Sequence, residues 1–310
     1  MMYTMRRSGL DAALPAGIGF IGLGVMGRPM AINLIGARGQ SRVSVHHRSQ
    51  DRVTDLLEAG AHWAATPREL AAASTVIVLM LPDLPEVDQV LDGPDGLLAG
   101  IQPGTVLVVS STSSAVGVRE LARRLEGRAG IVDAPVSGGE EGAVAGTLSI
   151  MVGGAEEDVE RALPVLATMG TPVHLGPLGA GEIAKFCNQL VVASTIMALG
   201  EAAVLAERNG LDLGALFGVL QGGYAGSRVL ETRADRIVSG DFGSSGKAKY
   251  MVKDLTFATE AAAQSATNAP QLQLLLRSFT ELTRRGFGEQ DISVTRAYVQ
   301  SLAEHPLKQS

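Results

Sequence analysis

The first half of the chain alternates short runs of β-branched and large aliphatic residues with stretches of amphipathic helical pattern. The strand-like runs cover residues 18–21, 42–45, 75–81 and 105–109. The helical stretches between them cover residues 25–38, 51–59, 67–73 and 85–91. Near-continuous apolar strands separated by helices are typical of a parallel sheet that is covered on both faces. Two further apolar runs, 148–152 and 172–175, flank a helical stretch at 156–169 and are expected to extend the same sheet.

Thr66, Pro67 and Glu69 mark the start of one of these helices. Threonine at the N-cap with glutamate three residues later forms a capping box, and proline fits the first helical position. The sequence therefore predicts a helix that begins at Pro67.

The pattern changes after Gly179. Residues 182–209 predict one long helix, which contains no proline and a single glycine, Gly200. The rest of the chain also has helical pattern, over residues 226–237, 247–263, 272–285 and 294–303. The predicted fold class is α/β: an N-terminal Rossmann-type doubly wound sheet, followed by an all-α C-terminal domain joined to it by a long helix. We expect a flexible leader over residues 1–16, a dinucleotide-binding domain over 17–178, and a helical substrate-binding and oligomerisation domain over 179–310.

Composition and charge exclude several classes of function. The net charge is −6 and the chain has no basic run, so neither nucleic acid nor an anionic membrane is an expected partner. One cysteine, Cys187, excludes an internal disulfide and a cysteine-only metal site, and we expect it to be a small buried residue. No apolar stretch is expected to reach the roughly 20 residues that span a bilayer. The N-terminus lacks the apolar core of a signal peptide, and we expect a cytoplasmic protein.

A glycine-rich turn follows the first predicted strand. Gly22, Gly24 and Gly27 form G-x-G-x-x-G at the start of a helix, with Leu23, Val25 and Met26 between them. In a dinucleotide site the first glycine makes the turn, the second lets the backbone approach the pyrophosphate, and the third allows close helix–strand packing. The helix N-terminus then offers N–H groups and a partial positive charge to the phosphates.

The end of the second strand bears on which dinucleotide binds. An NAD site usually has an acidic residue here, but the chain has His47, Arg48 and Ser49. Arg48 can pair with a 2′-phosphate and Ser49 can add a hydroxyl donor, which favours NADP(H) over NAD(H), although NAD(H) remains possible. The alternative is a solvated loop arginine. Leu81 and Pro82, at the end of another strand, are expected near the cofactor ribose.

Four blocks of sequence carry a more specific resemblance. The glycine loop continues into Met30-Ala31-Ile32-Asn33-Leu34, and the other three blocks are Asp133-Ala134-Pro135-Val136-Ser137-Gly138-Gly139 with Gly146-Thr147-Leu148, Gly179-Ala180-Gly181 with Lys185 and Asn188, and Lys253-Asp254-Leu255. In this order and spacing the chain resembles the β-hydroxyacid dehydrogenase family, from Gly17 onward. That family includes 3-hydroxyisobutyrate dehydrogenase and the tartronate and succinic semialdehyde reductases. The resemblance implies an NAD(P)-dependent oxidoreductase that interconverts a small hydroxy acid and its semialdehyde or keto acid.

The resemblance also implies roles for particular residues. Lys185 corresponds to the catalytic acid/base, Thr112 to a position that meets nicotinamide and substrate, and Lys253 to a lysine that contacts cofactor or substrate. From the residues alone, Lys185 and Asn188 are neighbours on one helix face, and an ammonium beside an amide suits carbonyl reduction, although the same spacing is common on solvated faces. The apolar neighbours of Lys185 (Ile183, Ala184, Phe186 and Cys187) suggest a mostly buried helix.

Ser137, Gly138 and Gly139 expose successive backbone N–H groups that can bind a substrate carboxylate, unless they form an ordinary glycine turn. For Lys253 the simpler alternative is a surface salt bridge. We expect no metal, because the adjacent histidines at 46 and 47 point in different directions on a strand.

Some features depart from the family or leave alternatives open. The asparagine pair usual after the lysine is Asn188-Gln189 here, and the asparagine usual before the cofactor arginine is His47. An imine reductase shares the plan but usually replaces the lysine, and 6-phosphogluconate dehydrogenase is longer with a His-Asn pair. A catalytically inactive NADP-binding module is the non-enzyme alternative. The apolar helix at 190–205 predicts a homodimer or homotetramer through the helical domain.

Overall fold

The computed structural model describes residues 13–243 and 246–304. The chain divides into two compact units, Met1–Lys185 and Phe186–Ser310, and the boundary falls inside the long helix α8 (Ala180–Arg208). Most of the predicted leader, residues 1–12, lies outside the described residues.

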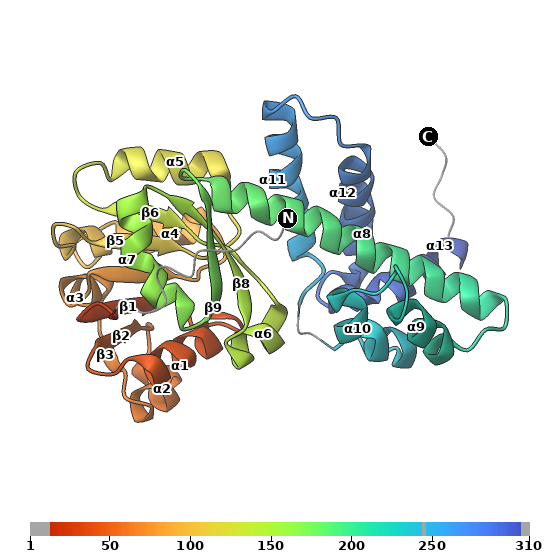
Figure 1. The fold of residues 1–310 in the computed structure, drawn as a ribbon, viewed down its shortest axis with the longest axis horizontal. Coiled ribbons are helices and arrows are strands. Elements are labelled where there is room, and N and C mark those ends of the chain that lie inside the picture. Colours follow the sequence, from red (N-terminus) through yellow and green to blue (C-terminus); the bar gives the residue numbers. More distant parts are fainter. Residues whose placement is uncertain (1–12, 244–245, 305–310) are drawn as a thin grey trace, which may run out of the picture. The chain divides into compact units, whose positions relative to one another are not determined.

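The first unit is built on one mixed sheet (Figure 1). Its strands are β1 (Gly17–Ile21), β2 (Arg42–His46), β3 (His62–Ala64), β4 (Val76–Leu79), β5 (Val106–Val109), β6 (Gly130–Asp133), β7 (Val136–Ser137), β8 (Leu148–Gly154) and β9 (Gly170–Gly176). The order β3-β2-β1-β4-β5-β6 is parallel throughout, as in dinucleotide-binding domains. β8 then pairs antiparallel with β6 and β7, and β9 pairs parallel with β8. The predicted extension of the sheet by the runs near 148 and 172 is therefore confirmed.

Helices connect the strands of this unit. They are α1 (Gly27–Ala37), η1 (Gln50–Val53), α2 (Thr54–Glu58), α3 (Pro67–Ala72), α4 (Leu84–Leu91), η2 (Leu97–Ala99), α5 (Ala115–Arg124), α6 (Gly139–Ala145) and α7 (Glu156–Ala167). Five of these elements were not predicted from the sequence: the short β3, β6, β7 and α6, and the ten-residue α5. The predicted capping box at α3 is present: the Glu69 N–H donates to Thr66 Oγ1 at 3.1 Å. Pro67 occupies the first turn, and the Glu69 carboxylate accepts from the Ala65 N–H at 2.9 Å.

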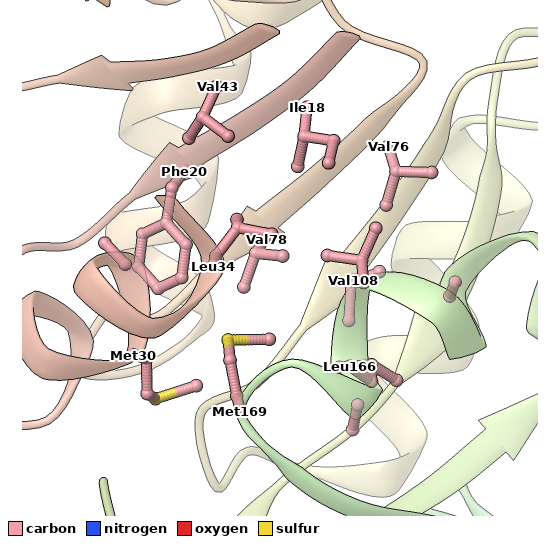
Figure 2. Packing of buried hydrophobic residues seen from close by; sticks show 14 of the residues in the cluster. Ile18, Phe20, Met30, Leu34, Val43, Val76, Val78, Val108, Leu166 and Met169 are labelled. Atoms are coloured by element: carbon pink, nitrogen blue, oxygen red, sulfur yellow. The ribbon is translucent and has the colours of Figure 1, made fainter. Parts of the chain in front are cut away.

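Alternation along the central strands divides the core between the two faces of the sheet. Val76 and Val78 belong to one buried cluster, with side chains of α1 and α7, whereas Ile77 and Leu79 belong to another, with side chains of α3, α4 and α5. Figure 2 shows the first cluster, in which Phe20 lies with residues from both the sheet and the helices. Each such fully buried side chain stabilises the fold by about 1.5–3 kcal/mol. Both faces are therefore covered, as the apolar pattern predicts.

The second unit is helical. After the C-terminal part of α8 it contains α9 (Leu213–Gln221), α10 (Arg228–Ser239), α11 (Tyr250–Gln264), α12 (Pro270–Leu282), η3 (Thr283–Phe287), η4 (Ile292–Val294) and α13 (Thr295–Glu304). The one glycine in the middle of α8 has a packing reason: a Cβ on Gly200 would lie 2.8 Å from the carbonyl carbon of Thr295. The Thr295 hydroxyl donates to the Ile196 carbonyl at 2.9 Å, so a side chain at the start of α13 bonds to the backbone of α8.

Helix α8 corrects one expectation from the sequence. It has 29 residues and contains a window with mean hydropathy 1.7, so by length and composition it could cross a membrane. The expectation that no apolar stretch reaches that length was therefore wrong. Half of the window is buried inside the protein, and core helices of folded domains meet the same criterion.

Candidate active site

The glycine loop lies where the sheet changes direction of winding. β1 pairs with β2 on one side and with β4 on the other, so the loops that follow β1 and β4 leave the same edge of the sheet. Gly22 has φ +100°, and a Cβ there would lie 2.2 Å from the Met80 carbonyl oxygen. A Cβ on Gly27 would lie 1.8 Å from the Gly22 oxygen, whereas a Cβ on Gly24 would meet nothing within 4 Å. The first and third glycines thus form the turn, and the backbone at Gly24 stays open to an approaching ligand.

This arrangement fits a dinucleotide. Gly24 and Val25 are exposed, and α1 begins at Gly27 after its N-cap Met26, so the helix N-terminus follows the open part of the loop. Leu81 is half-buried and Pro82 exposed, just beyond the end of β4. At Gly22 and Gly27 a side chain would collide with the backbone, whereas Gly24 faces open space. This is the arrangement that lets a pyrophosphate approach the backbone closely.

The turn after β2 holds an acidic residue that the sequence analysis overlooked. Arg48 is exposed, and the Ser49 N–H donates to His47 Nδ1 at 3.1 Å. The Ser49 hydroxyl donates to the carboxylate of Asp51, and this hydrogen bond lowers the pKa of Asp51. A phosphate at this turn would meet the Arg48 charge and would compete with Asp51 for the Ser49 hydroxyl. Asp51 lies two residues after Ser49, whereas the acidic residue of an NAD site was sought only as far as Ser49.

Thr112 lies in a serine-rich turn between β5 and α5. Ser110, Ser111 and Ser113 are buried, whereas Thr112 is half-buried. Ser114 closes the turn as N-cap of α5, accepting from the Gly117 N–H at 3.2 Å. Thr112 is therefore a more accessible hydroxyl than its three buried serine neighbours.

Lys185 is brought to the predicted substrate loop. Its side chain is 7% exposed, and its Nζ donates to the Val136 carbonyl at 2.9 Å. Ser137, half-buried, comes next in the chain, followed by Gly138 (φ +139°) and Gly139 (φ +66°) at the start of α6. Both the lysine and the loop were predicted from the sequence, and the Lys185 ammonium bonds to the residue directly before the loop.

The surroundings of Lys185 on α8 differ from expectation. Ile183 is 39% exposed and Cys187 is exposed, so the prediction of a buried cysteine was wrong. Lys185 and Gln189 are four residues apart and share the buried face, whereas Ile183 and Cys187 share an exposed one. The lysine is thus buried although two of its apolar neighbours are not.

In the second unit, the other predicted residues belong to a hydrogen-bonded chain. Asn188 Nδ2 donates to Gln189 Oε1 at 3.0 Å, and Gln189 Nε2 donates to Asp254 Oδ2 at 2.6 Å. Lys253 Nζ lies 3.5 Å from Asp254 Oδ1 and 5.4 Å from the centroid of the Phe257 ring. Gln189 and Asp254 are 7% and 6% exposed. The residue that departs from the family pattern therefore connects Asn188 to the Lys253-Asp254 pair.

Among the residues that the structure describes, no group of three or more histidine, cysteine or acidic side chains is arranged to hold a metal ion.

Known proteins resemble the chain over nearly its whole length. Residues 17–179 match the model of the NAD binding domain of 6-phosphogluconate dehydrogenase, and residues 179–298 match the model described as NAD-binding of NADP-dependent 3-hydroxyisobutyrate dehydrogenase. The 2-hydroxy-3-oxopropionate reductase of Escherichia coli is 37% identical over 94% of this chain and 99% of its own. The NAD-dependent L-serine dehydrogenase of Pseudomonas aeruginosa is 38% identical over 90% of this chain and 96% of its own.

The solved structures agree with this relationship. The crystal structure of 3-hydroxyisobutyrate dehydrogenase from Salmonella typhimurium superimposes with a TM-score of 0.82 at 30% identity, covering 91% of this chain and 99% of that one. Both halves of the fold, the ordered motifs and these relatives lead to one conclusion. The chain belongs to the β-hydroxyacid dehydrogenase family and is an NAD(P)-dependent hydroxyacid dehydrogenase of the 3-hydroxyisobutyrate dehydrogenase type.

Proposed function

We propose that the enzyme interconverts a small β-hydroxy acid and its semialdehyde with NADP(H), and that Lys185 is the general acid/base. The observation that carries the proposal is the buried Lys185 ammonium, held 2.9 Å from the Val136 carbonyl beside the Ser137–Gly139 loop. A cation and a row of backbone N–H groups at one place suit a substrate that has a carboxylate and a reacting oxygen close together.

The proton chemistry follows from the position of this ammonium. In the direction of reduction Lys185 donates a proton to the aldehyde oxygen as negative charge builds there, and in oxidation its neutral amine accepts the hydroxyl proton. The bond to Val136 fixes the direction of Nζ without removing its charge. Ser137, Gly138 and Gly139 bind the substrate carboxylate. Asn188 orients the reacting oxygen, and Thr112 and Lys253 keep the substrate- and cofactor-binding roles that the family resemblance implies.

The dinucleotide is proposed to bind at the glycine loop. When bound, it supplies or accepts the hydride at the carbinol carbon of the substrate. The residues proposed to contact it are Gly22, Leu23, Gly24, Val25, Met26, Gly27, His47, Arg48, Ser49, Leu81, Pro82, Thr112 and Lys253. Arg48 supports NADP(H), as does the description of the model matched by residues 179–298, whereas one relative is named NAD-dependent. Arg48→Ala is expected to raise KM for NADPH at least about tenfold and to leave KM for NADH nearly unchanged. An equal effect on both cofactors would refute the role of Arg48.

The relatives narrow the substrate class. The names 2-hydroxy-3-oxopropionate, L-serine and 3-hydroxyisobutyrate describe acids with an oxygen function on the carbon β to the carboxylate. They differ in the α-substituent, which is hydroxyl, amino or methyl. We propose a substrate of this same pattern, and a panel of these three pairs, assayed with NADPH and NADH in parallel, identifies the α-substituent. No turnover with any member, with NADPH binding retained, would overturn the substrate class.

Lys185→Ala tests the proposed acid/base. General acid–base catalysis contributes about 10²–10⁴-fold, so kcat is expected to fall by that factor while NADPH binding, followed by its fluorescence, persists. A small primary amine added to the variant is expected to restore part of the rate. Lys249→Ala is the matched control, because Lys249 is a partly exposed lysine paired with Glu289. If Lys185→Ala retains kcat within about tenfold of wild type, another group moves the proton.

A second copy of the chain is the proposed protein partner. In the second unit several apolar side chains are exposed, among them Val191 (64%) and Leu205 (68%) on α8 and Val219 (74%) on α9. Burying such residues between two copies removes apolar area from water. Light scattering coupled to gel filtration is expected to give a dimer or tetramer mass, and a monomer would refute the proposal.

A further inference from the structure

Asp133 holds the first turn of the helix that carries Lys185. It is the last residue of β6 and is fully buried. Its Oδ1 accepts from the Gly179 N–H at 2.7 Å, and its Oδ2 accepts from the Glu182 N–H at 2.8 Å. These N–H groups belong to the start of α8, where helical N–H groups have no partner within the helix. Asp133 thus caps α8 from another element, a role that the sequence analysis did not assign.

The start of α8 is packed closely against β8 and Asp133, which restricts where the helix can lie. A Cβ on Gly181 would lie 2.3 Å from the Met151 carbonyl oxygen, and a Cβ on Gly153 would lie 2.4 Å from Asp133 Oδ1. On the preceding turn, Arg119 of α5 donates from Nε to the Leu178 carbonyl at 3.0 Å. The carboxylate of Asp133 therefore sits in a space that glycines on two elements keep open.

Residues 133–136 make a second hydrogen-bonded contact with α8. Val136, three residues after Asp133, accepts the hydrogen bond from Lys185 Nζ. Lys185 is three residues beyond Glu182, which is about 4.5 Å along a helix axis at 1.5 Å per residue. One carboxylate and one carbonyl of residues 133–136 therefore fix both the helix start and the ammonium one turn later.

We propose that Asp133 is a positioning residue for the reaction: by capping α8 it sets where the Lys185 ammonium stands relative to the substrate loop. The proposal rests on the proposed acid/base role of Lys185. A displacement of a reacting group by about 1 Å can cost a rate factor of about 10². The cap therefore bears on the rate as well as on stability.

The chemistry of the cap explains why a carboxylate is needed. Burial raises the pKa of Asp133, while the N–H groups of Gly179 and Glu182 act in the opposite direction. Asparagine has the same shape but one acceptor oxygen, so its NH₂ would face one of the two N–H donors. The other charged groups at this helix start are the buried Glu182 on α8 and the exposed Arg119 on α5.

Asp133→Asn tests the proposal when combined with Lys185→Ala. In the wild-type background kcat is expected to fall about 10- to 100-fold, with KM for NADPH within about threefold. In the Lys185→Ala background the same substitution is expected to change kcat by less than about twofold, because the group that it positions is absent. A fall in kcat that persists in full without Lys185 would overturn the proposal. If Lys185→Ala alone is active, the proposed acid/base fails instead, and the two failures are distinguishable.

Two further variants separate positioning from general instability. Asp291→Asn is the matched control: Asp291 is also fully buried and accepts from the N–H groups of Ser293 (3.0 Å) and Gly246 (3.1 Å), but it lies in the second unit. At a temperature well below both unfolding midpoints its kcat is expected to stay within about twofold of wild type. A fall as large as that of Asp133→Asn would overturn the proposal. If Asp133→Asn does not fold, the exposed Arg119→Met carries the test, with a loss of a few-fold in kcat that vanishes in the Lys185→Ala background.

Discussion

Gln189 is the buried amide on which the hydrogen-bonded chain of the second unit depends. Gln189→Met keeps the length of the side chain and removes both of its polar groups. Asp254 then loses the donor at 2.6 Å while it remains 6% exposed, and Asn188 loses an acceptor at 3.0 Å. The substitution therefore removes both hydrogen bonds of the series Asn188–Gln189–Asp254 and leaves its two end residues in place.

The magnitude follows from these contacts. A hydrogen bond to a charged group contributes about 1.5–3 kcal/mol, and a buried acceptor left without its donor costs a comparable amount. Lys253, 3.5 Å from Asp254, keeps part of the compensation. We therefore expect Gln189→Met to lower the free energy of unfolding of the second unit by about 2 kcal/mol. A double-mutant cycle with Asp254→Ala, which removes the acceptor, should give a coupling energy of about 1.5 kcal/mol.

The assay must report on the second unit, because two units need not unfold together. Native-state hydrogen exchange of amides in α8 and α11 measures the loss there, while fluorescence of Trp63, the one tryptophan, follows the first unit and is expected not to change. Gln300→Met is the matched control: Gln300 donates to Glu207 at 3.0 Å but is only half-buried, so its loss should cost less than about 1 kcal/mol. A Gln189→Met variant within about 0.5 kcal/mol of wild type, or a coupling energy near zero, would refute the reasoning.

Three other outcomes are expected. Gly24→Ala should weaken NADPH binding at least about tenfold and leave the unfolding of the cofactor-free protein unchanged, whereas Gly27→Ala should destabilise the cofactor-free protein. Equal effects of the two variants in either assay would contradict the loop geometry. Thr66→Ala should cost the first unit about 1 kcal/mol in urea unfolding followed by tryptophan fluorescence, and Thr66→Ser should cost much less. Hydrogen bonds from two arginines lower the pKa of Glu281 to about 2, so its contribution to stability is present above pH 4.5 and is lost as the pH falls toward 2; thermal unfolding at several pH values, with Glu281→Gln flattening this dependence, checks the sign.

Local chemistry determined much of the first unit. Short continuous apolar runs separated by helical stretches predict the buried parallel strands β1, β2, β4 and β5, and the turn at Gly22 needs a residue that tolerates φ +100°, so both features can be predicted from one stretch of chain. The start of α3 could be predicted for the same reason, because its N-cap and its proline are adjacent in sequence. By contrast, β6 and α6 were missed: the apolar run of β6 has only two residues, Ile131 and Val132, and the seven residues of α6 make only about two turns.

Only the tertiary structure decided which of the named residues meet. Lys185 and Val136, or Gln189 and Asp254, are separated by 49 and 65 positions, and their contacts exist only once the sheet and the helices have packed. The faces of α8 were hidden for a related reason. Apolar residues occur on nearly every side of this helix, so its sequence has no amphipathic pattern from which to predict that Lys185 is buried and Cys187 exposed. The sequence by itself determined the family, an α/β first half followed by a helical second half, and the residue types available for chemistry, and long-range packing determined where those side chains stand.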